Sequence, residues 1–229
     1  MADDIVQDFD QLGWDTLAGC LSTCQNIPGF AGWENAHNAI ATRFRAAALA
    51  DEKFAESFLD AGQRYTQEES LFAFFFNAVS CVECFLYGLH HIGNLVAPND
   101  FPIATDTDLR DIRRGKVMER FTRVFPNDSL TKLIESVVSD DQFCRMLEFR
   151  DVLTHRGSIP RQHHVVVPVS GARQKPAAVF VSAKPKSAVS TTDTIPLGTT
   201  TTNSMRDWLA SRLRELFSET LNFCEDRLV

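Results

Sequence analysis

Arg150 and His155 are the two residues of this chain whose types and spacing best suit chemistry. A guanidinium keeps its proton in proteins, whereas a histidine titrates near neutral pH, with an unperturbed pKa of about 6.5. Together they could stabilise developing negative charge and transfer a proton. On an ideal helix a five-residue spacing separates two side chains by about 140° and about 7.5 Å. They would converge only if Arg150 bends towards the helix end and the last turn frays.

Arg150 stands where the helical pattern around it calls for an apolar side chain. The predicted apolar stripe of this helix comprises Phe143, Met146, Leu147 and Leu153, together with Arg150. Burying an unpartnered guanidinium costs several kcal/mol, so it must reach solvent, pair with a carboxylate, or face a groove or subunit interface. A structural ion pair with Glu83, the one charge within the long apolar segment, is the plainest alternative. In that case His155 merely complements the negative end of the helix dipole.

The segment Arg150-Asp-Val-Leu-Thr-His155 resembles the Arg-(polar)-x-x-x-His motif of HEPN domains, a superfamily of small helical bundles. Asp151 fits a position that is usually Asn, Asp or His in that family. The resemblance implies an up-and-down helical bundle that forms a homodimer, with the motif residues of both subunits in a shared cleft. Many members are metal-independent endoribonucleases of toxin–antitoxin, defence or RNA-processing systems. Others are catalytically inactive and bind nucleotides or other proteins.

The resemblance also implies roles for individual residues. RNA carries its own nucleophile, the 2′-OH, so cleavage needs an acid, a base and charge stabilisation on the phosphoryl oxygens. These roles would fall to His155 and Arg150 from two subunits, with Asp151 orienting one of them and Glu83 supporting Arg150. Residues expected to contact RNA are Arg156, Arg161 and His163, a solvated turn being the alternative for the last two. Expected partners are a second copy of the chain, RNA, and an antitoxin or another protein; no metal, cofactor or membrane is expected.

The net charge of −7 is unevenly distributed along the chain. Residues 1–100 carry 4 Lys+Arg against 14 Asp+Glu, residues 101–187 carry 15 against 10, and residues 188–229 carry 4 against 6. An acidic chain is a poor indiscriminate binder of nucleic acid, yet the middle third could present a local basic surface. The alternative is solvated helix faces. The cluster of Arg110, Arg113, Arg114 and Lys116, interleaved with aspartates, predicts exposed ion pairs.

Six cysteines without an export signal predict reduced thiols in a cytoplasmic protein. Cys20, Cys24, Cys81 and Cys84 could be assembled into a four-thiolate zinc site. This alternative is weaker because Cys81 and Cys84 lie in a helical pattern, whereas zinc knuckles present their cysteines from turns. His90-His91 is interpreted as a pair at a helix end rather than a metal site. The sequence contains no Gly-rich phosphate loop, nucleophile elbow or HExxH motif.

The elements that must position these residues predict a mainly α fold with one domain, 1–229, and an N-terminal segment, 1–31. The apolar run Leu71–Val82 is too short for a membrane span and suits a core helix. Two capping boxes, Thr66–Glu69 and Ser139–Gln142, predict helix starts. The predicted helices span about 32–60 (one or two helices), 67–95, 106–124, 128–138, 140–156 and 204–227. A β-hairpin (strands 165–169 and 177–182) and a Thr-rich loop (184–203) form a predicted insertion, 161–203, before the last helix.

Overall fold

The computed structural model of this protein describes residues 13–58, 60–155, 161–165, 179–183 and 195–228. The fold is mainly helical, as the sequence predicts. The helices are α2 (Trp14–Leu21), α3 (Phe30–Ser57), α4 (Arg64–Val96), α5 (Asp106–Arg110), α6 (Arg114–Val124), α7 (Ser129–Ser139), α8 (Asp141–His155) and α9 (Thr199–Leu228). Short 3₁₀ turns span Ser22–Cys24 and Ala61–Gln63, and the strands are β1 (Arg161–Val165), β2 (Val179–Ala183) and β3 (Ile195–Pro196).

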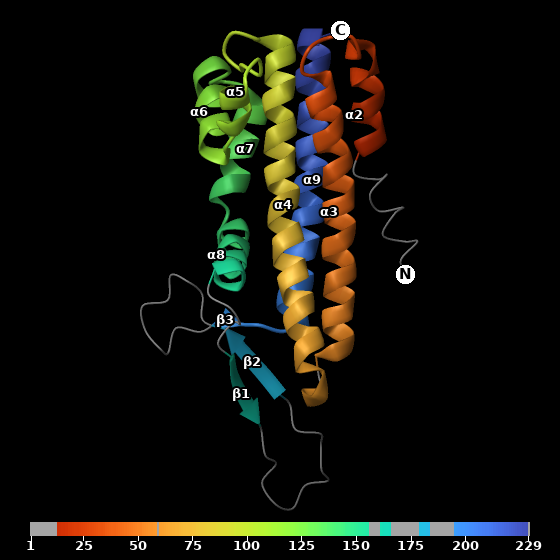
Figure 1. The fold of residues 1–229 in the computed structure, drawn as a ribbon, viewed down its shortest axis with the longest axis vertical. Coiled ribbons are helices and arrows are strands. Elements are labelled where there is room, and N and C mark those ends of the chain that lie inside the picture. Colours follow the sequence, from red (N-terminus) through yellow and green to blue (C-terminus); the bar gives the residue numbers. More distant parts are fainter. Residues whose placement is uncertain (1–12, 59, 156–160, 166–178, 184–194, 229) are drawn as a thin grey trace, which may run out of the picture.

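Three long helices, α3, α4 and α9, lie side by side along the long axis of the molecule (Figure 1). The chain runs down α3 and back up α4, and α9 runs in the same direction as α4. Helix α2 packs beside α3 and α9 at one end. Helices α5 to α8 form a second layer on the other side of α4, so α4 is the central element of the bundle (Figure 1).

Helix α4 is apolar enough and long enough to cross a membrane, with a mean hydropathy of 1.6 over its most apolar 18 residues. Of that window 61% is buried inside the bundle, as in the core helix that its sequence predicts. It approaches α3 closely, since a Cβ added at Gly88 would lie 3.2 Å from the Cβ of Ala36. The missing side chain therefore lets the two backbones pack tightly.

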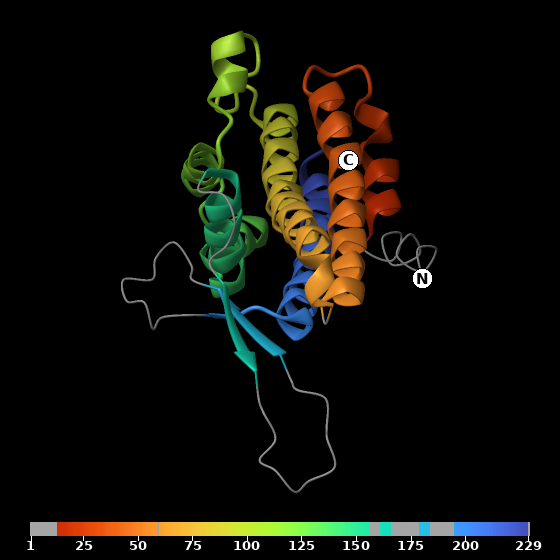
Figure 2. The same ribbon diagram turned by 60° about the horizontal axis from the view of Figure 1, so that its bottom comes forward.

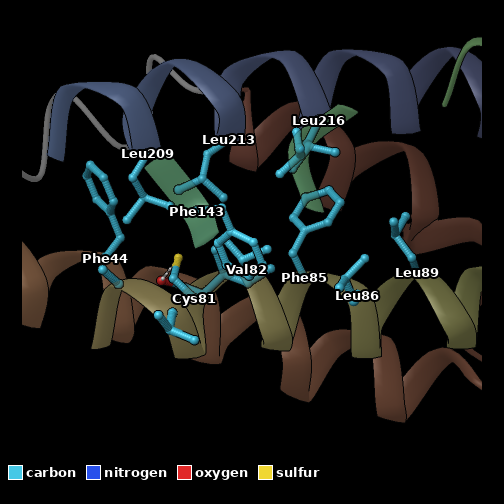
Figure 3. Packing of buried hydrophobic residues seen from close by; sticks show 14 of the residues in the cluster. Phe44, Cys81, Val82, Phe85, Leu86, Leu89, Phe143, Leu209, Leu213 and Leu216 are labelled. Atoms are coloured by element: carbon cyan, nitrogen blue, oxygen red, sulfur yellow. Dashed lines mark hydrogen bonds between the residues drawn. The ribbon is translucent and has the colours of Figure 1, made fainter. Parts of the chain in front are cut away.

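The core between α4 and α9 is built from leucines, phenylalanines and Cys81 (Figure 3). Leu209, Leu213 and Leu216 of α9 face Val82, Phe85 and Leu86 of α4 (Figure 3). Phe143 of α8 reaches the same cluster, so the second layer shares one core with the long helices.

Two predicted helix starts are wrong, that of α4 by three residues and that of α8 by one. Helix α4 begins at Arg64, directly after the 3₁₀ turn, so Thr66 lies inside the helix and does not cap it. Helix α7 extends through Ser139, and the cap of α8 is Asp140, whose Oδ1 accepts a hydrogen bond of 2.8 Å from the amide of Gln142. Asp140 thus supplies the side-chain cap expected from Ser139, whereas no side-chain hydrogen bond caps α4 at Gln63.

The predicted helix over 106–124 is broken in two. Thr105 caps α5 with a true capping box, in which its hydroxyl and the Asp108 carboxylate exchange hydrogen bonds with each other's amides. The helix stops after Arg110, and Arg113 adopts an extended conformation (φ −123°, ψ 151°) before α6. Charged residues continue with similar spacing across the break, so the sequence pattern does not reveal it. The break places the start of α6 against α4.

The three strands lie at the end of the bundle where α8 ends and α9 begins (Figure 2). β1 pairs antiparallel with β2, Arg161 opposite Ala183 and Val165 opposite Val179, and β2 pairs with β3. The predicted first strand, 165–169, lies outside the described residues except for Val165. The expected insertion boundary at 203 is wrong, because α9 already begins at Thr199.

Candidate functional site

The buried stripe of α8 differs from the predicted one. Phe143, Met146, Phe149 and Val152 are buried, whereas Leu147, Arg150 and Leu153 are half-buried. Phe149 anchors the stripe by stacking on Phe75 of α4, with ring centroids 4.8 Å apart. The buried residues therefore recur at every third position from Phe143 to Val152, a series that includes Phe149 and not Arg150. The expectation that Arg150 occupies an apolar position was wrong, and its side chain lies at the edge of the stripe.

Two carboxylates hold the Arg150 guanidinium at this edge. Its Nη1 lies 3.4 Å from Oε1 and 3.5 Å from Oε2 of Glu83 on α4, and its Nε donates to Oδ1 of Asp151 at 3.1 Å. The side chains of Arg150 and Glu83 are 22% and 41% exposed, so solvent reaches the pair. The ion pair between Arg150 and Glu83, named from the sequence as the structural alternative, is thus present.

The contacts of this cluster do not use all the N–H donors of Arg150. Among the described residues no hydrogen-bond partner faces its Nη2, and the contacts to Glu83 are long. With Asp151 included, the three side chains carry one positive and two negative charges. An anionic ligand would therefore need a further cation, or a displaced carboxylate, to bind here.

His155 is the last residue of α8, and its side chain lies outside the described part of the structure. The hydroxyl of Thr154 donates to the carbonyl of Arg150 at 2.8 Å, which closes the last turns of the helix. Whether the imidazole of His155 meets Arg150 stays a prediction. Arg156 lies outside the described residues, and so do the side chains of Arg161 and His163, whose backbones belong to β1.

Of the remaining histidine and cysteine candidates, His90, His91, Cys24 and Cys81 are buried, whereas Cys20 and Cys84 are half-buried. His90 is buried, with Nε2 3.1 Å from the carbonyl of Pro102 and Nδ1 3.2 Å from the guanidinium of Arg120. Cys81 is also buried and its thiol donates to the carbonyl of Ile40 at 3.6 Å (Figure 3). Within the described ranges, no group of three or more His, Cys, Asp or Glu side chains is arranged to hold a metal ion.

A second polar site was missed by the sequence reasoning. Glu83 also lines a pocket of about 470 Å³ between α3, α4 and the start of α6. Its wall includes three arginines, Arg43, Arg113 and Arg114. Arg113 and Arg114 were expected to form exposed ion pairs and form none among the described residues, whereas Lys116 of the same predicted cluster does form one, with Glu119 at 2.8 Å. No sequence signal links Arg43 to a pair of arginines seventy residues away.

The chemistry of the pocket is set by charge rather than by an ionised thiol. Cys84 lines it as well, and burial raises the pKa of this thiol, with Arg43 acting in the opposite direction and Glu83 in the same one. The thiol is therefore neutral near pH 7. The protein thus presents two adjacent polar sites, which share Glu83.

Searches of protein-family models, curated proteins and solved structures find no match to this chain. Its function has to be inferred from its own residues.

Proposed function

We propose that the protein is a HEPN-like, metal-independent endoribonuclease in which Arg150 and His155 are the catalytic residues. The observation that carries the proposal is the position of Arg150, at a solvent-reached seam between α8 and α4 and 22% exposed. Within the described residues its Nη2 makes no hydrogen bond, which leaves one donor group for a phosphoryl oxygen. The helical bundle and a helix that ends at His155 agree with the family resemblance of the motif.

The proposed reaction requires no group outside the protein and the RNA. One His155 removes the proton of the 2′-OH, whose oxygen attacks the adjacent phosphorus atom. The bond from phosphorus to the 5′-oxygen breaks, and a second His155 donates a proton to that leaving oxygen. The products are a 2′,3′-cyclic phosphate and a 5′-OH. Arg150 neutralises the charge that develops on the non-bridging oxygens, because its fork of N–H donors matches a phosphoryl group.

A homodimer follows from this division of labour. One chain carries one motif histidine, and the reaction needs both a base and an acid, so two subunits would contribute one His155 each. Each subunit would also bring its own Glu83 and Asp151, so dimerisation does not offset the excess of carboxylates around Arg150. In this proposal both carboxylates position Arg150 before RNA binds, and Arg156, Arg161 and His163 contact the RNA chain.

A second candidate function is favoured by the ion pair itself. If Arg150 only ties α8 to α4 through Glu83, the protein is a catalytically inactive helical module that binds a nucleotide or another protein. This reading predicts intact RNA after long incubation, and loss of structure or dimerisation when Arg150 is replaced.

Single-stranded RNA incubated with the purified full chain in EDTA separates the two candidates. For the ribonuclease, Arg150→Ala and His155→Ala should each lower the cleavage rate by about 100-fold or more. Arg145→Ala removes an exposed arginine from the same helix and should leave the rate unchanged. Equal activity in Arg150→Ala and Arg145→Ala would refute the assignment of Arg150.

A further inference from the structure

The arginine pocket is defined by Arg43, Arg113, Arg114 and Glu83, of which only Glu83 has a role in the proposed RNA cleavage. It has a volume of about 470 Å³ and opens between α3, α4 and the start of α6. Three cations and one carboxylate give its polar wall a net charge of +2, in a chain whose overall charge is −7. The pocket is therefore a local concentration of positive charge on an acidic protein.

Arg43 is held in place by uncharged groups. Its Nη1 donates to the side-chain oxygen of Asn77 at 3.1 Å, and its guanidinium lies 5.5 Å from the ring centroid of Phe76. Both contacts fix the direction of the side chain without neutralising its charge. Among the described residues no carboxylate lies within 4.0 Å of it. The guanidinium of Arg43 is thus held in a fixed direction, and among the described residues no carboxylate neutralises its charge.

Arg113 and Arg114 are exposed, and each has one contact with an uncharged group. Nε of Arg113 donates to the carbonyl of Arg110 at 3.4 Å, and the guanidinium of Arg114 lies 5.6 Å from the ring centroid of Phe143. Neither forms an ion pair within the described ranges. They also stand at the N-terminus of α6, which has no acidic residue in its first turn and no side-chain cap, so the helix dipole adds to their positive potential.

The rest of the wall limits what could enter. Leu86 and Val117 are buried and, with Ile112, give the pocket an apolar side. The helix just before it, α5, carries Arg110 in its last turn and Asp106 and Asp108 in its first, so the positive charge ends within one short helix in that direction. A bounded cationic pocket of this size suits a small anion better than a long nucleic-acid strand.

We infer that the arginine pocket binds a small multivalent phosphate anion, either inorganic pyrophosphate or the diphosphate group of an organic ester. Planar guanidinium groups bind phosphoryl oxygens through paired N–H donors, and the three arginines line one pocket from two separate elements. Two linked phosphoryl groups supply enough acceptors and charge for three such donors. The adjacent apolar wall shields these contacts from water on one side, while Arg113 and Arg114 are exposed on the other.

Glu83 gives the inference a distinctive consequence. It is the one carboxylate of the pocket wall, and Arg150 holds it from outside the pocket at 3.4 Å. A bound phosphate would be repelled by this carboxylate. Replacing Glu83 by glutamine should therefore tighten anion binding, whereas loss of an ordinary wall residue would weaken it. Arg150 itself does not line the pocket, so the inference stands whether or not the chain cleaves RNA.

Isothermal titration of the full chain with sodium pyrophosphate, and separately with ADP and adenosine, tests the site. We expect saturable binding of pyrophosphate, ADP or both with one site per chain, and none of adenosine. Arg113→Ala/Arg114→Ala should weaken binding by about tenfold or more, and Glu83→Gln should tighten it by about threefold. Arg45→Ala removes an exposed arginine from α3, two residues beyond Arg43, and should change the affinity by less than about twofold.

The two probes separate the sources of the phosphate. Binding of pyrophosphate alone would indicate an inorganic anion, and binding of ADP alone an organic ester whose remainder meets the apolar wall. Absence of saturable binding of both would overturn the inference, as would equal loss of affinity in Arg45→Ala and in the double variant. Thermal unfolding of each variant checks that its fold is kept. An Arg150→Ala chain that no longer cuts RNA should still bind the probe.

Discussion

Nη1 of Arg150 and Oε1 of Glu83 lie 3.4 Å apart and join α8 to α4 at a solvent-reached seam. Glu83 is also the acidic residue of the arginine pocket. One carboxylate therefore contacts the proposed catalytic arginine on one side and the proposed anion site on the other. A substitution at one site should therefore change the surroundings of Glu83 and, through this side chain, affect the other site.

The stability of the protein should depend little on Arg150. Because the paired side chains are 22% and 41% exposed, Arg150→Ala should lower the free energy of unfolding by no more than about 1 kcal/mol. Urea unfolding followed by circular dichroism measures this, with Arg145→Ala as the control. A loss of about 3 kcal/mol or more would make the arginine a structural residue and favour the inactive module.

A buried ion pair elsewhere should matter far more. Asp51 of α3 is fully buried and its Oδ2 accepts from Nη1 of Arg206 on α9 at 2.8 Å. Arg206→Ala leaves that carboxylate without its cation and should cost about 3–5 kcal/mol near neutral pH. Asp207→Ala removes a 70% exposed carboxylate from the same arginine and should cost less than about 1 kcal/mol. Similar losses in both variants would contradict a special role for the Asp51 contact.

The Arg206→Ala defect should shrink as the pH falls. Burial raises the pKa of Asp51, while the Thr202 hydroxyl and Arg206 lower it. Without Arg206 the folded-state pKa rises further above the unfolded value, so the folded protein binds this proton more tightly. Unfolding measured at pH 8 and pH 5 should therefore show the larger deficit at pH 8. A deficit that grows on acidification would contradict this.

Two buried histidines should make the protein acid-sensitive. Burial lowers the pKa of His37 and of His91 to about 4, below the unperturbed 6.5. Between about pH 6.5 and pH 4 the unfolded chain binds protons at these histidines and the folded chain does not. The free energy of unfolding therefore has its full value above about pH 6.5 and falls as the pH drops towards 4. Each histidine contributes a slope of about 1.4 kcal/mol per pH unit within that window.

Unfolding measured from pH 7 to pH 4.5 tests this slope. His37→Phe and His91→Phe should each flatten the curve in this range, and both together should flatten it further. A curve that keeps its full slope in the double variant would assign the acid sensitivity to other groups.

The ribonuclease proposal also requires two chains. Light scattering should give twice the 25.7 kDa mass of one chain. A mass of 25.7 kDa at the concentrations at which RNA is cut would contradict a site shared between subunits.

Much of the helical framework could be predicted from the sequence because long apolar stripes fix which face of a helix is buried. The central helix was predicted over 67–95 and spans Arg64–Val96. The contact between Arg150 and Glu83 was also named from the sequence, as the structural alternative, since Glu83 is the one charge within the apolar part of that helix. The position of Arg150 at the edge of the stripe was not predicted. Apolar spacings along this helix are compatible with either Phe149 or Arg150 facing the core.

The arginine pocket could not be predicted, for a different reason. Arg43 comes from α3, and Arg113 owes its position to the break between α5 and α6, which the alternating charges of that segment conceal. Local patterns describe one element at a time, whereas this pocket exists only after three elements have packed.

The most direct test of the proposed function is the chemistry of the RNA ends. The full chain, incubated in EDTA with a single-stranded RNA of defined sequence, should produce fragments whose masses correspond to 2′,3′-cyclic phosphate and 5′-OH ends, and His155→Ala should produce none. Intact RNA, fragments ending in 3′-OH and 5′-phosphate, or equal cleavage by His155→Ala would contradict the assignment.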